Sequence, residues 1–350
     1  MPRASGPSTQ GGSEPDYGSP ARGQAPGSFY PLNVDRVVQL TISLFRFRWR
    51  VFLGIALVVL IPMSVVSGLL QAFIGEAIAR STRDMLLAMQ RGQATGASML
   101  ALIPWPALIV SWLVSVLISL ITYVALAATI RATSVAVSGG RPTVTQSLRE
   151  ALHRFGALAV VYLVSFLVTL AVLLVGGAVA GLLFLASFSN GAFQPGIFVF
   201  IALIVMVALL ALVIFIAVRW SFALAAVMIE DAGGLTALRR SWGLAVGSSW
   251  RILGYLLLFG LLAGLPAAVI GYVAIAVLGS GVTETATGLL VANPVEAFVS
   301  TFSIGVIAAL FSPFPTIGLT LLYFDVRWRR GEPVPQPGSA TPPRPATPPI

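Results

Sequence analysis

The sequence of 350 residues contains no cysteine and no lysine, and it has a single histidine, His153. The absence of cysteine excludes disulfides, thiolate nucleophiles and metal sites built on thiolates. One imidazole cannot form a histidine cluster for a metal ion. Acid/base or metal-assisted catalysis needs convergent side chains, and the twelve acidic residues are scattered along the chain. We therefore predict no catalytic residue, no cofactor, no bound metal and no enzymatic activity.

The one adjacent pair of acidic residues is Glu230 and Asp231, which precede two glycines. We interpret this pair as a solvated turn followed by the start of a helix, where negative charge is favourable. A contact with a cation or a lipid headgroup is the alternative interpretation.

Charge is also scarce, since only 9% of the residues are charged and 57% are hydrophobic. A soluble domain has about 25% charged residues. A helix needs about 20 apolar residues to cross a hydrocarbon core of about 30 Å, and several uncharged runs are longer than this. We predict an all-α, polytopic membrane helix bundle within residues 30–330. The expected spans are about 51–73, 99–130, 156–186, 197–218, 252–279 and 297–324.

The two ends of the sequence differ from the apolar middle. Residues 1–29 are polar and rich in glycine, serine and proline, and residues 331–350 are rich in proline. Such compositions cannot bury enough apolar surface to fold, so we predict two disordered tails. The proline-rich tail favours extended polyproline geometry, and its alternative role is to bind a partner protein.

Arginine is distributed unequally between the two sides of the expected spans. Eighteen arginines fall on one side, and three, Arg80, Arg83 and Arg91, fall on the other. Positively charged loops stay on the cytoplasmic side of a membrane. We therefore expect both termini in the cytoplasm and a location in the plasma or inner membrane, and the arginine-rich, alanine-rich composition suggests a bacterial source.

Three amphipathic stretches precede pairs of spans, at about 33–49, 143–155 and 235–246. Each has apolar residues at helical spacing and arginines on the opposite face, which is typical of a helix that lies in the membrane plane. Thr143 and Gln146 form a capping box at the start of the second stretch. We interpret the chain as three repeats of an interfacial helix followed by a transmembrane hairpin. The alternative is that any polytopic protein has basic amphipathic loops.

Short motifs in these stretches resemble a known family. The segment from Leu238 to Leu244 reads LRRSWGL and is followed by Gly247 and by Trp250–Arg251; two further segments are 33–54 and 322–327. They resemble the bacterial family named the membrane domain of glycerophosphoryl diester phosphodiesterase. The resemblance covers about 33–330 and implies a membrane region without the separate catalytic barrel. That barrel would have a His-Arg pair, and we interpret His153–Arg154 here as a chance dipeptide.

The basic residues that give the net charge of +9 flank apolar spans. We therefore expect the partner to be the lipid bilayer with its anionic headgroups, and we expect no nucleic acid. The expected headgroup contacts are Arg46, Arg48, Arg50, Arg239, Arg240, Arg327, Arg329 and Arg330. The sequence does not fix the oligomeric state.

Two functions follow from this reading. The first is a non-catalytic membrane module that organises lipids or partner proteins at the cytoplasmic face. The second is a transporter or a lipid-translocating protein with its site at proline-broken helices, because Pro62, Pro266, Pro313 and Pro315 lie inside expected spans. Ser111, Ser115 and Ser119 share one helical face, which we interpret as a packing surface, with a polar pathway as the alternative.

Overall fold

A computed structural model describes residues 33–92, 101–186, 195–278, 282–284 and 290–334. The two predicted tails fall outside these residues except for 331–334. The helices are α1 (Val34–Gln90), α3 (Trp105–Val137), α4 (Val144–His153), α5 (Phe155–Ala186), α6 (Pro195–Trp220), α7 (Ala223–Glu230), α8 (Gly234–Ala245), α9 (Ser249–Leu278), α10 (Pro294–Phe311) and α11 (Pro313–Arg329). A short antiparallel pair, β1 (Val282–Glu284) and β2 (Leu290–Ala292), precedes α10.

Six helices or helix pairs within the described residues are long and apolar enough to cross a membrane. They are Val34–Gln90, Trp105–Val137, Phe155–Leu182, Phe200–Glu230, Ser249–Leu278 and Pro294–Arg329. The predicted all-α bundle with six such helices is confirmed. The last of them combines α10 and α11, which are separated only at Ser312.

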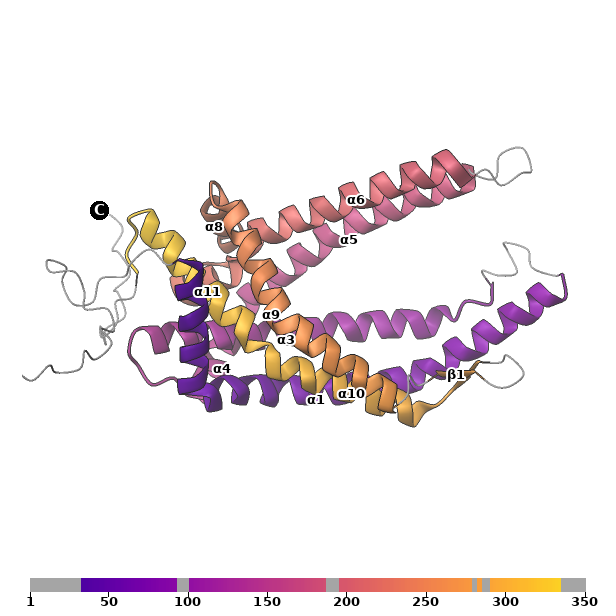
Figure 1. Ribbon diagram of the computed structural model, residues 1–350, viewed down its shortest axis with the longest axis horizontal. Coiled ribbons are helices and arrows are strands. Elements are labelled where there is room, and N and C mark those ends of the chain that lie inside the picture. The colour runs from indigo at the N-terminus through magenta and orange to yellow at the C-terminus, as the bar shows by residue number, and fades with distance from the viewer. Residues whose placement is uncertain (1–32, 93–100, 187–194, 279–281, 285–289, 335–350) are drawn as a thin grey trace, which may run out of the picture.

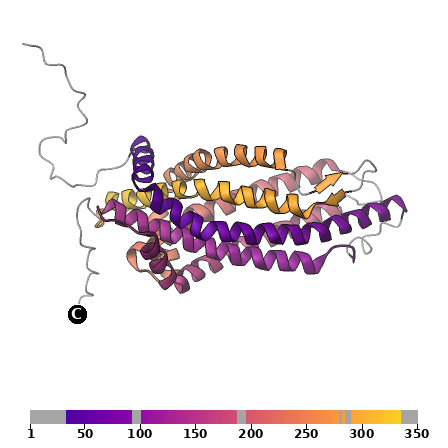
Figure 2. The ribbon, with the colours of Figure 1, turned by 90° about the horizontal axis from the view of Figure 1, so that it is seen from below.

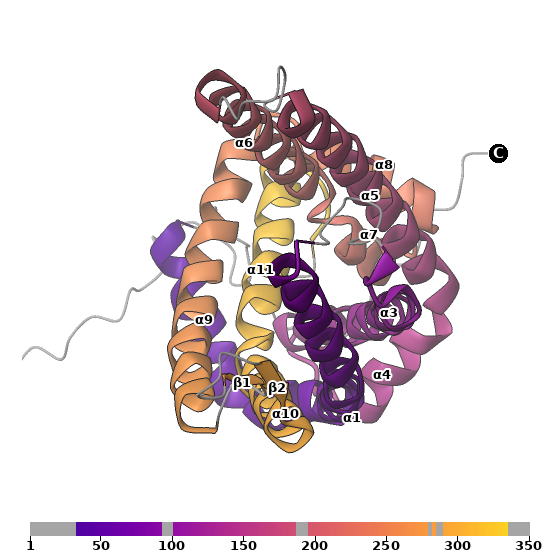
Figure 3. The ribbon, with the colours of Figure 1, turned by 90° about the vertical axis from the view of Figure 1, so that its right-hand side faces the viewer.

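The long helices run side by side, and the short amphipathic helices gather at one end of the bundle (Figure 1). We call this the arginine-rich end and define it by residues 34–50, 131–154, 219–251 and 325–334. The β1–β2 pair lies at the opposite end (Figure 1). Seen along the bundle, α1, α9 and α10 lie on one side and α5 with α6 on the other, and α3 and α11 lie between them (Figure 3).

Helix α1 contains a sharp bend at Arg48, whose backbone leaves the helical region at φ −124° and ψ 25°. The segment before the bend turns across the bundle end (Figure 2), as an interfacial helix would. The segment after it continues to Gln90, over about 60 Å at 1.5 Å per residue. The helix therefore extends well beyond residue 73, where the expected span ends. No glycine or proline interrupts 76–90, so the helix continues beyond the apolar run.

The other two amphipathic stretches form α4 and α8, also at the arginine-rich end. The capping box has the expected partners, since Thr143 Oγ1 accepts from the backbone N–H of Gln146 at 3.3 Å. In α8 the buried residues Ala237, Leu238 and Ser241 repeat at helical spacing, while Arg239 between them is exposed. Each of the three amphipathic helices is followed by a pair of long helices, in the order that the repeat interpretation requires.

The largest fully buried side chains concentrate in the half of the bundle nearest the arginine-rich end, and they include Phe52, Phe222 and Tyr323. Closer to the opposite end, α1 and α10 approach through small residues. A Cβ atom at Gly305 would lie 2.2 Å from Ser64 Oγ, so only glycine fits there. Large apolar side chains of α5 and α6 are exposed, as expected for helices that face lipid rather than water.

The proline pair after Ser312 breaks the last span, as the sequence predicted. Pro313 has no N–H to donate to the carbonyl of Ala309. The Ser312 hydroxyl donates to that carbonyl instead, at 3.0 Å. The helix itself therefore satisfies the carbonyl that the proline leaves free.

Candidate functional site

The eight arginines expected to contact headgroups divide into two groups. Arg46, Arg50 and Arg239 are exposed and have no carboxylate partner among the described residues. The other five contact protein groups: Arg48 donates to the carbonyl of Gly140 at 3.3 Å, and Arg240, Arg327, Arg329 and Arg330 bind carboxylates or carbonyls described below. Lipid contact remains a prediction for all eight, and the first three are best placed for it.

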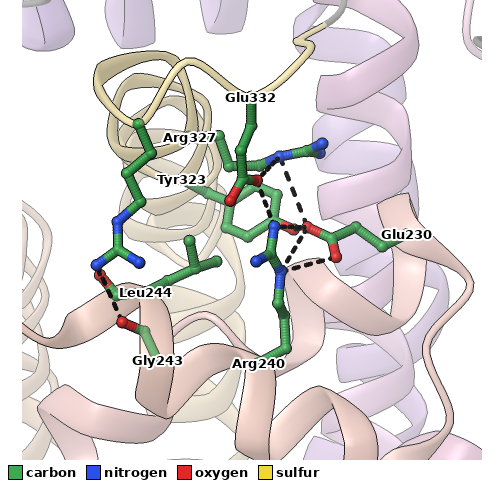
Figure 4. A network of polar contacts seen from close by, with 8 residues as sticks. Glu230, Arg240, Gly243, Leu244, Tyr323, Arg327 and Glu332 are labelled. Carbon is green, nitrogen blue, oxygen red and sulfur yellow. Dashed lines mark hydrogen bonds and ion pairs between the residues drawn. The ribbon is translucent and has the colours of Figure 1, made fainter.

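A network of charges joins α7, α8 and α11 (Figure 4). Arg240 Nε lies 3.0 Å from Glu230 Oε2, and Arg240 also pairs with Glu332. Arg327 Nε lies 3.1 Å from Glu332 Oε2 and 3.6 Å from Glu230 Oε1. Tyr323 donates its hydroxyl to Glu230. Two carboxylates thus meet two guanidinium groups and one phenol, and the charges of the acids and bases balance.

The network shifts the pKa values of Glu332 and Arg240, two members that lie outside the membrane spans. Burial opposes the charged form of Glu332, but hydrogen bonds and positive charge from Arg240 and Arg327 outweigh it and hold the pKa below its ordinary value. Burial likewise opposes the charge of Arg240, and the two carboxylates outweigh it and raise the pKa of the guanidinium. Both groups are therefore charged at neutral pH.

The interpretation of a solvated turn is wrong for Glu230, whereas the Asp231 side chain is 74% exposed at a turn. The Glu230 side chain is only 21% exposed and is held by the network. Asp231 ends α7 in the left-handed region at φ 56° and pairs with Arg154. Arg154 also donates to the carbonyl of Val227, so it ties the start of α5 to α7. The contacts of Arg154 with Val227 and Asp231 join residues more than seventy positions apart, which no local pattern could reveal.

A second buried carboxylate, Asp325, connects α9 and α11. Its side chain is fully buried, and its Oδ2 lies 3.0 Å from both Arg251 and Arg329. A buried carboxylate requires such partners, since removal from water disfavours its charge. The sequence had placed Asp325 only in a family-like motif, where nothing indicated that it is buried.

Arg330 caps the end of α8 from outside. Its Nη2 donates to the carbonyls of Gly243, Leu244 and Val246 at 2.9, 3.1 and 2.9 Å. A cation at a helix C-terminus satisfies free carbonyls and complements the helix dipole. The segments 238–244 and 322–327, which carry the family-like motifs, are thus joined in space by Arg330 and by the charge network.

Arg219, at the end of α6, has a different environment from these paired arginines. Its guanidinium carbon lies 5.0 Å from the ring centre of Phe215 and 5.3 Å from that of Trp242. Its Nε and Nη1 atoms are buried without a hydrogen-bond partner among the described residues. Ser241 fixes the arrangement, because its hydroxyl donates to the carbonyl of Arg219 at 2.7 Å and accepts from the N–H of Phe222 at 3.1 Å. Sequence analysis did not select Arg219.

The described residues contain no group of three or more histidine, aspartate and glutamate side chains that could hold a metal ion. His153 ends α4, and its neighbour Arg154 is engaged with Asp231. Among the described residues of the arginine-rich end, the carboxylates of Glu150, Glu230, Asp231, Asp325 and Glu332 are paired with arginines.

No curated protein and no solved structure matches the chain. One family model matches residues 56–316, from α1 to the start of α11. Its description names no phosphodiesterase, so the resemblance to the glycerophosphoryl diester phosphodiesterase membrane domain rests on the short motifs alone. Because the match covers most of the 350 residues, the chain belongs to the family described as a domain of unknown function, DUF7847.

Proposed function

We propose that this protein is a non-catalytic, multi-pass membrane module whose arginine-rich end gathers anionic lipid headgroups. The observation that carries this proposal is Arg219, a cation that packs against the contacting rings of Phe215 and Trp242 with no carboxylate partner in the described structure. An unpaired charge at the edge of a membrane span is costly unless a counter-ion is near. The phosphate of an anionic lipid is the counter-ion that a bilayer supplies.

The surroundings of Arg219 fit a headgroup. Trp242 is 40% exposed, and Arg239 lies three residues earlier on the same helix and is also exposed. Residues three apart share a helix face, so Arg239 and Trp242 present one surface beside Arg219. The indole of Trp242 can lie at the headgroup level of the bilayer, and the guanidinium groups of Arg219 and Arg239 can bind the phosphate of a lipid there.

Arg46 and Arg50 form a second exposed group beside the bend of α1. Arg50 lies over the ring of Trp49, with 5.5 Å between the guanidinium carbon and the ring centre. Each basic residue near an anionic leaflet contributes about 1 kcal/mol to binding. These two arginines, together with Arg239 and the half-buried Arg219, can therefore enrich anionic lipid around the bundle.

The proposal includes an orientation. The arginine-rich end would face the cytoplasm of a bacterial cell, with both termini on that side of the plasma membrane, because fifteen of the 21 arginines belong to it and only three lie in the expected loops of the other side. A bound partner protein on the proline-rich tail, 331–350, remains a separate prediction.

The transporter alternative has less support. It places a site at proline-broken helices, where free carbonyls would face a cavity. The carbonyl left free by Pro313 is already satisfied by Ser312. No hydration or ligand is needed to explain this break.

The test is lipid retention measured by native mass spectrometry on protein from nanodiscs of phosphatidylcholine with phosphatidylglycerol. We expect Arg219→Gln with Arg239→Gln to retain several-fold less phosphatidylglycerol at low salt, because each of the two arginines adds attraction for anionic headgroups. The matched control, Arg80→Gln with Arg91→Gln, removes the same charge from the opposite end and should retain as much as the wild type. Equal retention by both double variants would refute the proposal. Arg240 is unsuitable for this test because it belongs to the charge network.

A further inference from the structure

The last residues that the structure describes, 330–334, fold back on α8 and carry a carboxylate into the charge network. We call this segment the C-terminal strap. Gly331 turns the chain after the end of α11 with φ 72°, a left-handed value that favours glycine. Arg330 attaches the strap to the end of α8 through three carbonyls, and Val334 packs against the hydrophobic core. These contacts on either side of Glu332 fix its position.

Glu332 lies between two arginines that come from different helices (Figure 4). Arg240 of α8 and Arg327 of α11 both donate to the same oxygen, Oε2, which is 3.1 Å from Arg327 Nε. The other oxygen, Oε1, makes no hydrogen bond to a described residue. Nη1 of Arg240 and both Nη atoms of Arg327 likewise make no hydrogen bond within the described part of the chain. The two arginines can therefore bind an anion that offers more acceptor contacts than Glu332 makes.

The charge of this site, with Glu332 moved aside, favours a monoanion. Arg240 and Arg327 would then share one carboxylate, that of Glu230, which lies 3.0 Å from Arg240 and 3.6 Å from Arg327. Two guanidinium groups and one carboxylate leave one positive charge, and a phosphodiester carries one negative charge. The planar fork of donors in arginine matches the oxygens of a phosphate group. A phosphodiester thus fits the site in charge and in hydrogen bonding.

The site also lies where a bilayer has its phosphates. Trp328, next to Arg327, is 37% exposed, and Trp242 on α8 is 40% exposed. Exposed indoles at the ends of spans anchor at the headgroup level. The side chains of Arg240 and Glu332 are 32% and 24% exposed, so the site is open to groups from outside the protein. The phosphodiester that this position supplies is the headgroup of an anionic lipid.

We propose that Glu332 is an autoinhibitory contact, which occupies an anion site made by Arg240 and Arg327 and gives way to the phosphodiester of an anionic lipid. This inference rests on the proposed function, because it concerns the same class of lipid at the same end of the bundle. A site that its own chain occupies binds an outside ligand with an affinity reduced by the fraction of protein in which the site is free. The C-terminal strap therefore keeps this site closed until anionic lipid is abundant around the bundle.

The first test compares Glu332→Gln with the wild type in nanodiscs of phosphatidylcholine with phosphatidylglycerol, with retained lipid measured by native mass spectrometry. Glutamine does not neutralise the two arginines, so the site gains one positive charge. We expect the variant to retain about fivefold more phosphatidylglycerol at low salt, the effect of one unmasked basic charge beside an anionic leaflet. A purely structural ion pair predicts no such gain, because its loss would weaken the fold without creating a lipid site.

The matched control is Glu150→Gln, which removes the same charge from the same end of the bundle. Glu150 pairs with Arg131, and in the described structure no second arginine pairs with it, so retention should stay close to that of the wild type. Arg240→Gln combined with Glu332→Gln removes half of the anion site and should return retention to the wild-type value. Glu332→Asp keeps the charge on a shorter side chain and should give an intermediate gain.

A second measurement shows whether the lipid fills the site. A ligand that binds only the folded protein raises its melting temperature. In detergent, short-chain phosphatidylglycerol should raise the melting temperature of Glu332→Gln by more than that of the wild type. Short-chain phosphatidylcholine should shift the two proteins equally. Inorganic phosphate should not reproduce the larger shift, because it has no acyl chain to hold it at the headgroup level.

Three results would overturn the inference. They are equal retention by Glu332→Gln and the wild type, an equal gain in Glu150→Gln, which would make net charge sufficient, and an equal thermal shift with inorganic phosphate. Arg219 and Arg239 are unchanged in every variant of this test. A gain in Glu332→Gln, together with no loss in the Arg219 and Arg239 double variant, would refute the Arg219 site alone, and the reverse pattern would refute the autoinhibitory contact alone.

Discussion

The hydroxyl of Tyr323 in α11 donates a hydrogen bond to Glu230, the last residue of α7. This bond joins two helices through residues that are 93 positions apart in the sequence. Around this bond Arg240 and Arg327 bring their positive charge to the same carboxylate. The amphipathic helix α8 is thereby fixed against the end of the last span. This attachment also sets the position of Trp242 beside Arg219, since both lie in or against α8.

The first prediction concerns the stability that this network provides. Glu230→Gln leaves Arg240 with one carboxylate, and we expect it to lower the free energy of unfolding by about 1–3 kcal/mol, because the pair is mostly buried. Tyr323→Phe should cost about 1 kcal/mol, the value of one hydrogen bond. The measurement is the apparent melting temperature in detergent, followed by tryptophan fluorescence.

The control for this prediction is Glu76→Gln, which breaks the exposed pair of Glu76 with Arg80 on α1. Exposed pairs contribute little, so this variant should melt like the wild type. If Glu76→Gln and Glu230→Gln lower the melting temperature equally, the network has no special role in holding α8.

The second prediction is a dependence of stability on acid. The folded protein holds the pKa of Glu332 below 4.5, its ordinary value. At a pH between the lowered pKa of the folded protein and 4.5, the unfolded chain binds a proton at Glu332 that the folded protein does not. Stability therefore falls as the pH drops through that window. Above about pH 4.5 the contribution is complete. We expect Glu332→Gln to melt below the wild type at pH 7 and to approach it as the pH falls below 4.5. A difference between the two that is constant with pH would show that the ionised carboxylate is not responsible.

The third prediction concerns the contact between α1 and α10. Gly305→Ala places a methyl group against Ser64, and we expect a loss of about 1–3 kcal/mol from overpacking. Ser64→Gly in the same chain should restore part of that stability. Gly264→Ala is the matched control, because its new Cβ atom meets nothing within 4 Å and alanine favours the helix. Equal effects at the two glycines would contradict the close contact.

The sequence was sufficient for features set by local composition. Uncharged runs located the six long helices, Pro313 and Pro315 located the break in the last one, and Thr143 located the start of α4. The amphipathic patterns near 143–155 and 235–246 correspond to α4 and α8. These features depend on neighbours within about one helical turn, or on the length of an apolar run, which a single sequence displays.

The sequence was insufficient where distant residues decide the structure. Nothing in the segment around Glu230 indicates that Arg240, Tyr323 and Arg327 surround it, because two of these partners lie more than ninety positions away. Arg219 was overlooked because its aromatic partner Trp242 is on another helix. The bend at Arg48 has no proline or glycine to mark it. The extent of α1 to Gln90 was missed because a helix can continue past the membrane without apolar residues.

The central claim is that the arginine-rich end and the opposite end of the bundle lie on different sides of a membrane, with the arginines inside. Because the chain has no cysteine, single cysteines can be introduced without removing others. Thr145→Cys and Thr236→Cys place exposed thiols on α4 and α8, and Gln90→Cys and Val295→Cys place them at the opposite end. Intact cells would be treated with an impermeant maleimide. The account predicts labelling of the cysteines at 90 and 295 and protection of those at 145 and 236 until the cells are opened. Labelling of 145 and 236 in intact cells, with protection of 90 and 295, would contradict it.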